Sequence, residues 1–277
     1  MKTYRDFVSD LPLRPAIVAH RGAWHLAPEN SVASILRAAE AGYEVVEIDV
    51  QCSADGVLFL MHDETLTRMT GEAALAQSLS WTELRALALR AGDGQGDAAP
   101  TAHRIPTLKE ALEAAHGRIY LDVDVKSPAQ NMEAAGAAIA AAGMQDYVDI
   151  KIPLHSDADA ERLAALEAQY GVMVMPMTRF TADTVAQHIA RLARTGARIV
   201  ETEFNALSTI ADNRAAFEAA GLTLWVNTLT PVAQCGLTDA AALVDPDGIW
   251  GALMAAGVTV FQTDEPEALA AWRAARG

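Results

Sequence analysis

Short runs rich in β-branched and other apolar residues alternate with alanine-rich runs along almost the whole chain. The first kind has the length and composition of strands, and the second repeats apolar residues at helical spacing. Eight strands are expected, at residues 16–20, 44–50, 118–126, 147–152, 172–177, 198–204, 222–228 and 258–263. Helices are expected between most of them, at residues 31–41, 107–115, 131–142, 158–170, 182–195 and 208–220.

This alternation limits the fold class. Eight strand–helix repeats in 277 residues predict an α/β fold of the (β/α)8, or TIM barrel, type. Length alone also allows two ordinary domains. No linker is long enough to separate two domains, so we expect one domain over residues 1–277.

Two segments interrupt the alternation. Residues 56–62 predict an extra strand that pairs as a hairpin with the second barrel strand. Residues 64–104 predict a small insertion after the second barrel strand, with one helical piece at 81–89 and a loop rich in glycine and aspartate.

Composition excludes several classes of partner. The formal net charge of −15 argues against nucleic acid or an anionic membrane as a partner. Two cysteines, Cys52 and Cys235, are too few for a secreted disulfide framework. No apolar run reaches the ~18 residues of a membrane span, and the first residues do not resemble a signal peptide. We therefore expect a soluble cytoplasmic protein without stable membrane association; no pattern indicates its oligomeric state.

The strand at 44–50 carries acidic residues at every second position. Because side chains alternate between the faces of a strand, Glu47 and Asp49 project together. Two partly buried carboxylates side by side cost several kcal/mol, on the order given for unpaired buried charge. A cation would remove that cost, and oxygen ligands suit Mg²⁺ or Ca²⁺ better than zinc. We expect one divalent cation here, with a structural ion-pair network as the alternative.

Polar residues lie at or near the ends of six predicted strands, including the strand that carries Glu47 and Asp49. In TIM barrels the active site lies where strands end and the following loops begin. The residues concerned are His20, Arg21, Glu47, Asp49, Asp122, Asp124, Lys126, Glu201, Glu203, Trp225, Asn227, Thr263 and Asp264, and the turn after the second strand adds His62 and Asp63. Carboxylates for a metal, basic side chains for an anion and histidines for proton transfer are the parts of a phosphate-ester hydrolase.

Nine sequence blocks, taken in order, resemble the signature of the glycerophosphodiester phosphodiesterase family, in particular its bacterial cytoplasmic members. They are AHRG (19–22), PEN (28–30), EIDV (47–50), ADG (54–56), HDETLTRMTG (62–71), IPTLKEAL (105–112), DVK (124–126), WVN (225–227) and TDEP (263–266). The resemblance implies a TIM barrel with a small insertion after the second strand. It also implies one divalent cation and cleavage of a small-molecule glycerophosphodiester into sn-glycerol 3-phosphate and an alcohol.

The resemblance further implies a role for individual residues. Glu47, Asp49 and Asp124 correspond to metal ligands, and His20 and His62 to the catalytic acid–base pair. The family usually has Glu at the position of Asp124, so Asp122, on the same face of that strand, is an alternative ligand.

Substrate contacts are also implied. Arg21 and Lys126 correspond to phosphate contacts, although Lys126 could instead only neutralise Asp124. Glu29 is expected to support the site or to bind the glycerol end. Trp225 is expected to form a wall of the substrate site, with core packing as the alternative. Glu203, with Glu201, is expected to bind metal or glycerol or to belong to a salt-bridge network.

Three functions fit these residues. The first is hydrolysis of glycerophosphodiesters, with either water or the substrate's own glycerol 2-hydroxyl as nucleophile. The second is a phospholipase-D-like or lysophospholipase-D-like reaction on a lipid phosphodiester. The third is a non-catalytic barrel that binds phosphoesters, in which His20 or His62 would be expected to be missing; both are present.

Overall fold

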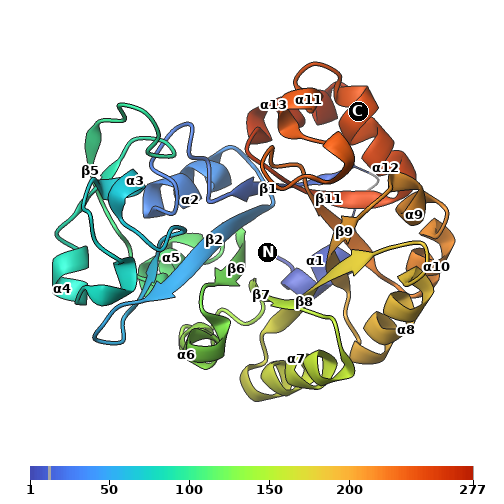
Figure 1. The fold of residues 1–277 in the computed structure, drawn as a ribbon, viewed down its shortest axis with the longest axis horizontal. Helices are drawn as coiled ribbons and strands as arrows, with labels where there is room; N and C mark the ends of the chain where they lie inside the picture. The colour runs from blue at the N-terminus through green and yellow to red at the C-terminus, as the bar shows by residue number, and fades with distance from the viewer. Residues whose placement is uncertain (12–13, 277) are drawn as a thin grey trace. The chain divides into compact units, whose positions relative to one another are not determined.

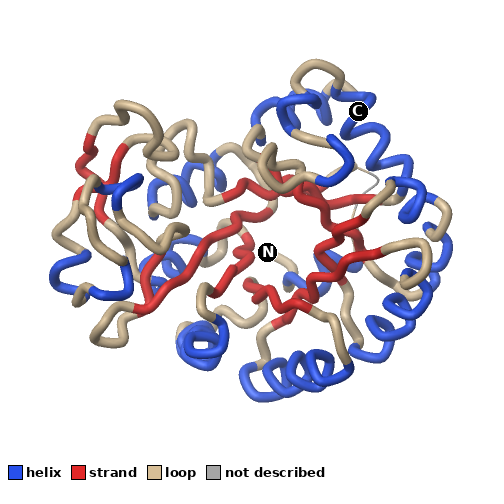
Figure 2. Tube along the Cα trace, in the orientation of Figure 1, coloured by secondary structure: helices blue, strands red, loops and turns tan. Residues whose placement is uncertain are grey.

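The computed structural model describes residues 1–11 and 14–276. Within them a strand is found at each predicted position (Figure 1). These strands are β1 (Ala16–His20), β2 (Val45–Cys52), β6 (Tyr120–Val125), β7 (Val148–Pro153), β8 (Met173–Phe180), β9 (Ile199–Phe204), β10 (Thr223–Asn227) and β11 (Val258–Thr263). Helices separate them along the chain (Figure 2), which is the succession of elements of the (β/α)8 fold.

The chain divides into two compact units, and the division passes through β1 and β7. The first unit contains residues 19–150, and the second contains most of the remaining residues. A single domain over residues 1–277 stays a prediction. No helix in the described part of the chain is both long enough and apolar enough to cross a membrane.

The first unit is built on parallel strands in the order β2-β6-β7. Glu47 is the register partner of Asp122, and Asp49 is the partner of Asp124. Strand β3 (Leu58–Leu60) pairs antiparallel with the end of β2, as the predicted hairpin requires. The helices α2 (Val32–Glu40), α5 (Leu108–Ala115) and α6 (Pro128–Ala141) belong to this unit. All of β2 except its last residue is buried, so its acidic face is removed from water.

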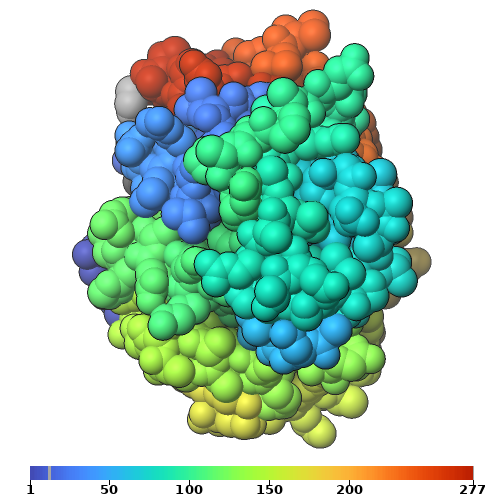
Figure 3. Space-filling view, turned by 90° about the vertical axis from the view of Figure 1, so that its left-hand side faces the viewer, coloured from blue at the N-terminus to red at the C-terminus, as the bar shows by residue number. Residues whose placement is uncertain are grey.

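The insertion after β3 has a hydrophobic core of its own. It contains α3 (Thr67–Thr70), the 3₁₀ turn η1 (Ala76–Ser78), α4 (Trp81–Leu84), β4 (Ala88–Arg90) and β5 (Pro100–Arg104). Strands β4 and β5 form an antiparallel pair. The buried residues of this core are Phe59, Met61, Leu66, Met69, Ala76, Leu84, Leu89 and Ile105. Figure 3 shows the insertion, in teal and green, as a continuous part of the surface.

The helix predicted at 81–89 was too long. Helix α4 starts at a capping box between Ser80 and Glu83 but ends at Leu84, and residues 88–90 form β4. Leu84 and Leu89 both belong to the core of the insertion. In one helix these two side chains would point about 140° apart. The change from helix to strand between them allows both to be buried.

The second unit contains parallel strands in the order β11-β10-β9-β8. Its helices are α1 (Tyr4–Ser9), α7 (Asp157–Tyr170), α8 (Val185–Thr195), α9 (Leu207–Ala211), α10 (Arg214–Ala219), α11 (Asp239–Ala242), α12 (Ala252–Ala256) and α13 (Pro266–Ala274), with the 3₁₀ turn η2 (Gln234–Gly236) and the π-helical segment η3 (Asp247–Gly251). The helix predicted at 208–220 is divided into α9 and α10. The Asn213 amide donates to the Thr209 carbonyl at 3.0 Å, a local bond of the kind that competes with helix continuation.

Candidate active site

Three carboxylates from two neighbouring strands lie together in the first unit. Glu47 and Asp49 lie on β2, and Asp124 lies on β6. One oxygen of each lies within 4.8 Å of the others. Glu47 and Asp49 are 2% and 1% exposed, so both have left water. An all-oxygen donor set fits a hard divalent cation, so these residues could hold the ion expected from the sequence.

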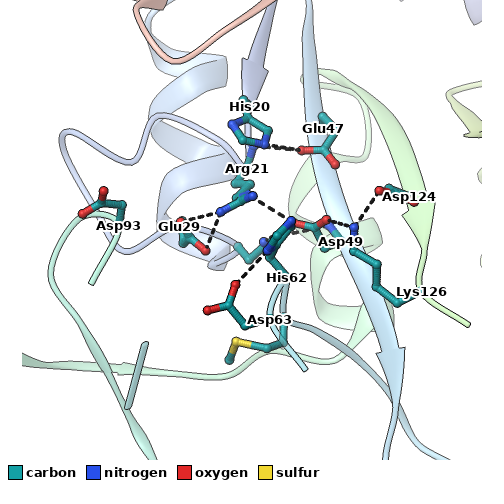
Figure 4. Close-up of polar contacts among 12 residues, drawn as sticks. His20, Arg21, Glu29, Glu47, Asp49, His62, Asp63, Asp93, Asp124 and Lys126 are labelled. Atoms are coloured by element: carbon teal, nitrogen blue, oxygen red, sulfur yellow. Dashed lines mark hydrogen bonds and ion pairs between the residues drawn. The ribbon is translucent and has the colours of Figure 1, made fainter. Parts of the chain in front are cut away.

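Two basic side chains surround Asp49 (Figure 4). The Lys126 ammonium lies 2.8 Å from one Asp49 oxygen and 2.7 Å from Asp124 Oδ2. Arg21 Nε lies 3.4 Å from the other Asp49 oxygen. Burial by itself would raise the pKa of the Asp49 carboxyl, but Lys126 and Arg21 outweigh burial and hold that pKa well below its usual range. Asp49 is therefore ionised at neutral pH although it is buried.

The turn after β1 positions His20 and Arg21. Arg21 and Gly22 both have left-handed backbones, with φ of 56° and 86°. A Cβ on Gly22 would lie 2.4 Å from Ser34 Oγ, so glycine is required there. The Arg21 backbone N–H donates to Glu47 Oε2 at 3.1 Å, and His20 Nε2 lies 3.9 Å from the same oxygen. This turn therefore brings His20 and Arg21 next to the carboxylates.

Asn30 fixes the orientation of Asp49. Its side-chain amide donates to Asp49 Oδ2 at 2.7 Å, and its side-chain carbonyl accepts the Asp49 backbone N–H at 3.0 Å. Asn30 has a left-handed backbone with φ of 50°, and its own N–H donates to the Arg21 carbonyl at 2.9 Å. The two loops around the site are thus joined to the strand that carries the carboxylates.

A second group of contacts holds His62. Its Nδ1 lies 2.8 Å from Asp63 Oδ1, and Asp63 also accepts from Arg68 Nε at 2.8 Å. The bond to His62, together with Arg68, lowers the pKa of the Asp63 carboxyl well below its usual range although burial opposes this. An ionised Asp63 can only accept, so the tautomer that forms this bond has its proton on His62 Nδ1 and leaves Nε2 outside the bond. The Gln51 amide donates to the Met61 and Asp63 carbonyls at 2.9 and 2.7 Å and steadies this segment.

Glu29 lies between two arginines and is 2% exposed. It accepts from Arg21 Nη1 at 3.1 and 3.2 Å and from Arg68 Nη2 at 2.6 Å. The negative charge of Glu29 is therefore paired with Arg21 and Arg68. Whether Glu29 supports the site or binds the glycerol end stays a prediction.

Trp225 and Glu203 belong to the second unit, where they lie in different environments. Trp225 is fully buried, and its indole N–H donates to Asn227 Oδ1 at 2.8 Å. The Lys151 ammonium lies 5.3 Å from the centre of the Trp225 ring and 3.0 Å from Glu201 Oε2. The Glu203 side chain is 49% exposed and pairs with Arg179 at 3.1 Å. Substrate contacts by Trp225 and Glu203 stay predictions.

Comparison with known proteins decides the family. The model of the glycerophosphoryl diester phosphodiesterase family matches residues 20–202, which include every residue of the first-unit site. The chain belongs to this family. A model of a domain of unknown function also matches residues 174–273.

Curated relatives from this phosphodiesterase family match the chain over part of their length. Human glycerophosphoinositol inositolphosphodiesterase GDPD2 is 39% identical over 146 residues, covering 44% of this chain and 27% of the relative. Mouse glycerophosphodiester phosphodiesterase 1 is 39% identical over 123 residues, covering 44% and 37%. The glycerophosphodiester phosphodiesterase of Caldanaerobacter subterraneus is 34% identical over 116 residues, covering 42% and 46%. The chain thus spans less than half the length of each of these relatives.

Solved structures of the family confirm the fold. A glycerophosphoryl diester phosphodiesterase from Parabacteroides distasonis superposes with a TM-score of 0.80 at 20% identity, covering 100% of this chain and 93% of that one. A glycerophosphodiester phosphodiesterase from Agrobacterium tumefaciens has a TM-score of 0.64 at 25% identity, covering 93% and 99%. An Oleispira antarctica phosphodiesterase in complex with the product sn-glycerol-3-phosphate has a TM-score of 0.66 at 23% identity, covering 93% and 96%. The predicted (β/α)8 fold is confirmed.

Within this phosphodiesterase fold, the structure brings together most of the residues predicted from sequence. Eight of them lie in the first unit: His20, Arg21, Glu29, Glu47, Asp49, His62, Asp124 and Lys126. Asp122, the alternative ligand, is fully buried beside Glu47, one pleat deeper on β6, and the carboxylate cluster contains Asp124 instead. Sequence reasoning assigned no role to Asn30, Asp63 or Arg68. Asn30 and Arg68 were marked only by their place within the PEN and HDETLTRMTG blocks, and Asp63 also by its place beside His62 in the turn after the second strand.

Proposed function

We propose that this protein is a divalent-cation-dependent hydrolase that cleaves glycerophosphodiesters into sn-glycerol 3-phosphate and an alcohol. Membership of the phosphodiesterase family supports the reaction class. The observation that carries the proposal is the arrangement around Asp49, where carboxylates, an arginine and a lysine meet within contact distance. A small-molecule substrate, a cytoplasmic location and the single-domain organisation remain parts of the same proposal.

Glu47, Asp49 and Asp124 would hold the cation, either Mg²⁺ or Ca²⁺. Such an ion, when bound, would draw electron density from a phosphoryl oxygen and offset the charge of the carboxylates. Asn30 keeps the Asp49 carboxylate in one orientation through its bond of 2.7 Å. An ionised and oriented carboxylate is the form in which a ligand binds a hard cation.

Arg21 and Lys126 would contact the phosphodiester. Both side chains are positively charged and partly open, with 15% and 25% of their surfaces exposed. Negative charge builds on the phosphoryl oxygens as the nucleophile adds, and donors placed beforehand stabilise it without reorganising. Glu29 would hold the Arg21 guanidinium in place through its bonds to Nη1.

His20 and His62 would transfer protons. One imidazole accepts the proton of the nucleophile, and the other donates a proton to the oxygen of the departing alcohol. The bond from phosphorus to that oxygen breaks as the bond to the nucleophile forms. The nucleophile is either water or the glycerol 2-hydroxyl, and in the second case water opens the cyclic phosphate afterwards. Trp225 and Glu203 are the proposed further contacts to the substrate.

Assays with three substrates test this proposal. The purified protein would be incubated with glycerophosphocholine, glycerophosphoinositol or lysophosphatidylcholine, each with Mg²⁺, with Ca²⁺ and with excess EDTA. We expect glycerol 3-phosphate from at least one of the glycerophosphodiesters, and we expect EDTA to stop its release. Preferential cleavage of lysophosphatidylcholine would support the lipid-directed alternative instead. Absence of turnover on all three substrates would contradict an enzymatic role, and turnover that persists in EDTA would contradict the need for a cation.

A further inference from the structure

We propose that Arg68, in the insertion, is a positioning residue that fixes His62 and Arg21 at the same time. This inference rests on the proposed function, because it concerns residues that would act in that reaction. Arg68 binds Asp63 and Glu29, and these two carboxylates bind His62 and Arg21. We call the group Arg68, Asp63 and Glu29 the Arg68 clamp.

The first arm of the Arg68 clamp leads to His62. Arg68 donates to both oxygens of Asp63, from Nε at 2.8 Å and from Nη2 at 3.0 Å. Such a paired contact fixes the carboxylate in a plane as well as at a distance. Asp63 then holds His62 Nδ1 at 2.8 Å, so the orientation of the imidazole follows that of the guanidinium.

The second arm leads to Arg21. Arg68 Nη2 also donates to Glu29 Oε1 at 2.6 Å, and both oxygens of Glu29 accept from Arg21 Nη1. Without Arg68, Glu29 would keep one arginine and could turn toward it, since a second cation would no longer draw it. Arg68 thus fixes, through Glu29, the position of the Arg21 N–H groups that do not bind Glu29.

The insertion in turn holds Arg68. Its Nη1 donates to the backbone carbonyl of Asp93, in the loop between β4 and β5. That loop packs closely on α3, because a Cβ on Gly94 would lie 2.6 Å from the Arg68 carbonyl oxygen and 2.7 Å from Met69 Sδ. The Arg68 side chain is only 21% exposed. The inference therefore gives the insertion a role in catalysis beyond covering part of the surface.

Substitution of Arg68 tests the clamp by kinetics. Arg68→Met removes both arms, and Arg68→Lys keeps the charge but cannot donate in a planar pair. We expect kcat to fall by about 10- to 100-fold in both variants, the range seen when a partner that orients an active residue is lost. Arg85→Met, which changes an exposed arginine of the same insertion, is the control and should keep the wild-type rate.

Nitrogen chemical shifts of the His62 ring provide a test that needs no turnover. The signal is assigned by its absence from His62→Ala. The wild type should show the ring proton on Nδ1, which faces Asp63, whereas Arg68→Lys should show a mixture of both tautomers. If Arg68→Lys kept both the wild-type tautomer and the wild-type kcat, the clamp would be wrong. If the wild type hydrolysed no glycerophosphodiester, the proposed function would fail while the ring shifts still tested the clamp.

The two arms can be separated by their own variants. Asp63→Asn breaks the His62 arm and should lower kcat, with no further loss when it is combined with Arg68→Lys. Glu29→Gln breaks the Arg21 arm and should mainly raise KM, since Arg21 would contact the phosphate. Additive losses in the Asp63 and Arg68 pair would overturn the inference. If Arg68→Met does not fold, these comparisons still test whether Arg68 positions His62 and Arg21.

Discussion

The Lys126 ammonium lies 2.8 Å from Asp49 and 2.7 Å from Asp124 and so bridges two of the three clustered carboxylates. These two carboxylates raise the pKa of Lys126 above its ordinary value, although burial opposes this. The lysine is therefore charged at neutral pH. It pairs with two of the three carboxylates that are proposed to hold a divalent cation.

Lys126→Met should separate cation binding from catalysis. Removing a positive charge next to Asp49 should tighten binding of Mg²⁺ or Ca²⁺ by at least ~10-fold, or ~1.4 kcal/mol. Hydrolysis should nevertheless fall by roughly 100-fold or more, because a donor to the phosphate is lost. Calorimetric titration and steady-state kinetics measure the two effects. Lys109→Met, at a lysine with 79% of its side chain exposed, is the control.

A weaker affinity in Lys126→Met would contradict this interpretation. It would mean that the ammonium mainly keeps the carboxylates in position and does not compete with the cation. Unchanged hydrolysis would remove Lys126 from the phosphate contacts and leave it only the role of neutralising Asp124.

Paired substitutions on β6 should identify the third ligand. Asp124→Asn should weaken cation binding by about 10-fold or more, or ~1.4 kcal/mol, because an amide oxygen is a poorer ligand than a carboxylate. Asp122→Asn should change cation affinity little, because Asp122 lies one pleat deeper on β6 and is not part of the carboxylate cluster. Calorimetry on both variants gives the answer. The reverse order of affinities would assign the ligand to Asp122.

His62→Ala should nearly abolish turnover without loss of the cation. His62 has no atom in the carboxylate cluster, so the affinity for Mg²⁺ or Ca²⁺ should stay within about 2-fold of wild type. The rate of hydrolysis should fall by a factor on the order of 100 to 10,000, the usual contribution of a general acid or base. An unchanged rate in this variant would remove His62 from the mechanism.

The positions of the strands could be predicted because each is a short apolar run between turns. Few other secondary structures fit such a run. It also predicted that Glu47 and Asp49 share a face, since side chains alternate along any strand. The same reasoning placed Asp122 and Asp124 on one face of the strand that becomes β6. These predictions need only local periodicity and the parallel order of neighbouring strands.

Contacts that depend on turns and on the insertion could not be predicted in this way. Asn30 donates to Asp49 from a loop in which its backbone is left-handed, and local periodicity predicts neither the contact nor that conformation. Arg68 and Glu29 are 39 residues apart in the sequence and meet only once the insertion has folded. Residues 81–89 carry a helix start signal, yet burial of both Leu84 and Leu89 decided where that helix ends.

Gly22→Ala should destabilise the protein and disorganise the site. The new Cβ would lie 2.4 Å from Ser34 Oγ and 2.9 Å from the Ser34 carbonyl carbon, at a backbone φ of +86°. Overlap in a packed region and the left-handed backbone together should cost about 2–4 kcal/mol. Gly42→Ala is a matched control, since its φ is +76° but no atom lies within 4 Å of the added Cβ. That control should lose only about 1 kcal/mol.

Thermal or urea unfolding measures both glycine variants. Equal losses in the two would show that backbone conformation alone matters and that Ser34 moves aside without cost. In that case hydrolysis by Gly22→Ala should also stay close to wild type, because His20 and Arg21 would keep their places.

Asp63 should give the stability of the protein a specific dependence on acid pH. The hydrogen bond from His62, with Arg68, lowers the pKa of its carboxyl below the ordinary 3.8 in the folded state. A lowered folded-state pKa stabilises the protein at pH values above 3.8, and this stabilisation is lost as pH falls through the lowered value. The Asp63 side chain is 26% exposed, so after discounting for solvent the contribution should be about 1 kcal/mol.

Urea unfolding of wild type and Asp63→Asn between pH 7 and pH 3 should therefore show a difference in the free energy of unfolding that is constant at neutral pH. The difference should shrink as the pH drops below the ordinary value of 3.8. Asp97→Asn, at an exposed aspartate of the same insertion, should follow the wild type throughout. A difference that did not change with pH would mean that Asp63 contributes by packing. In that case the ion pair with Arg68 would contribute little to stability, because a charge effect must disappear once the carboxyl is protonated in both the folded and the unfolded chain.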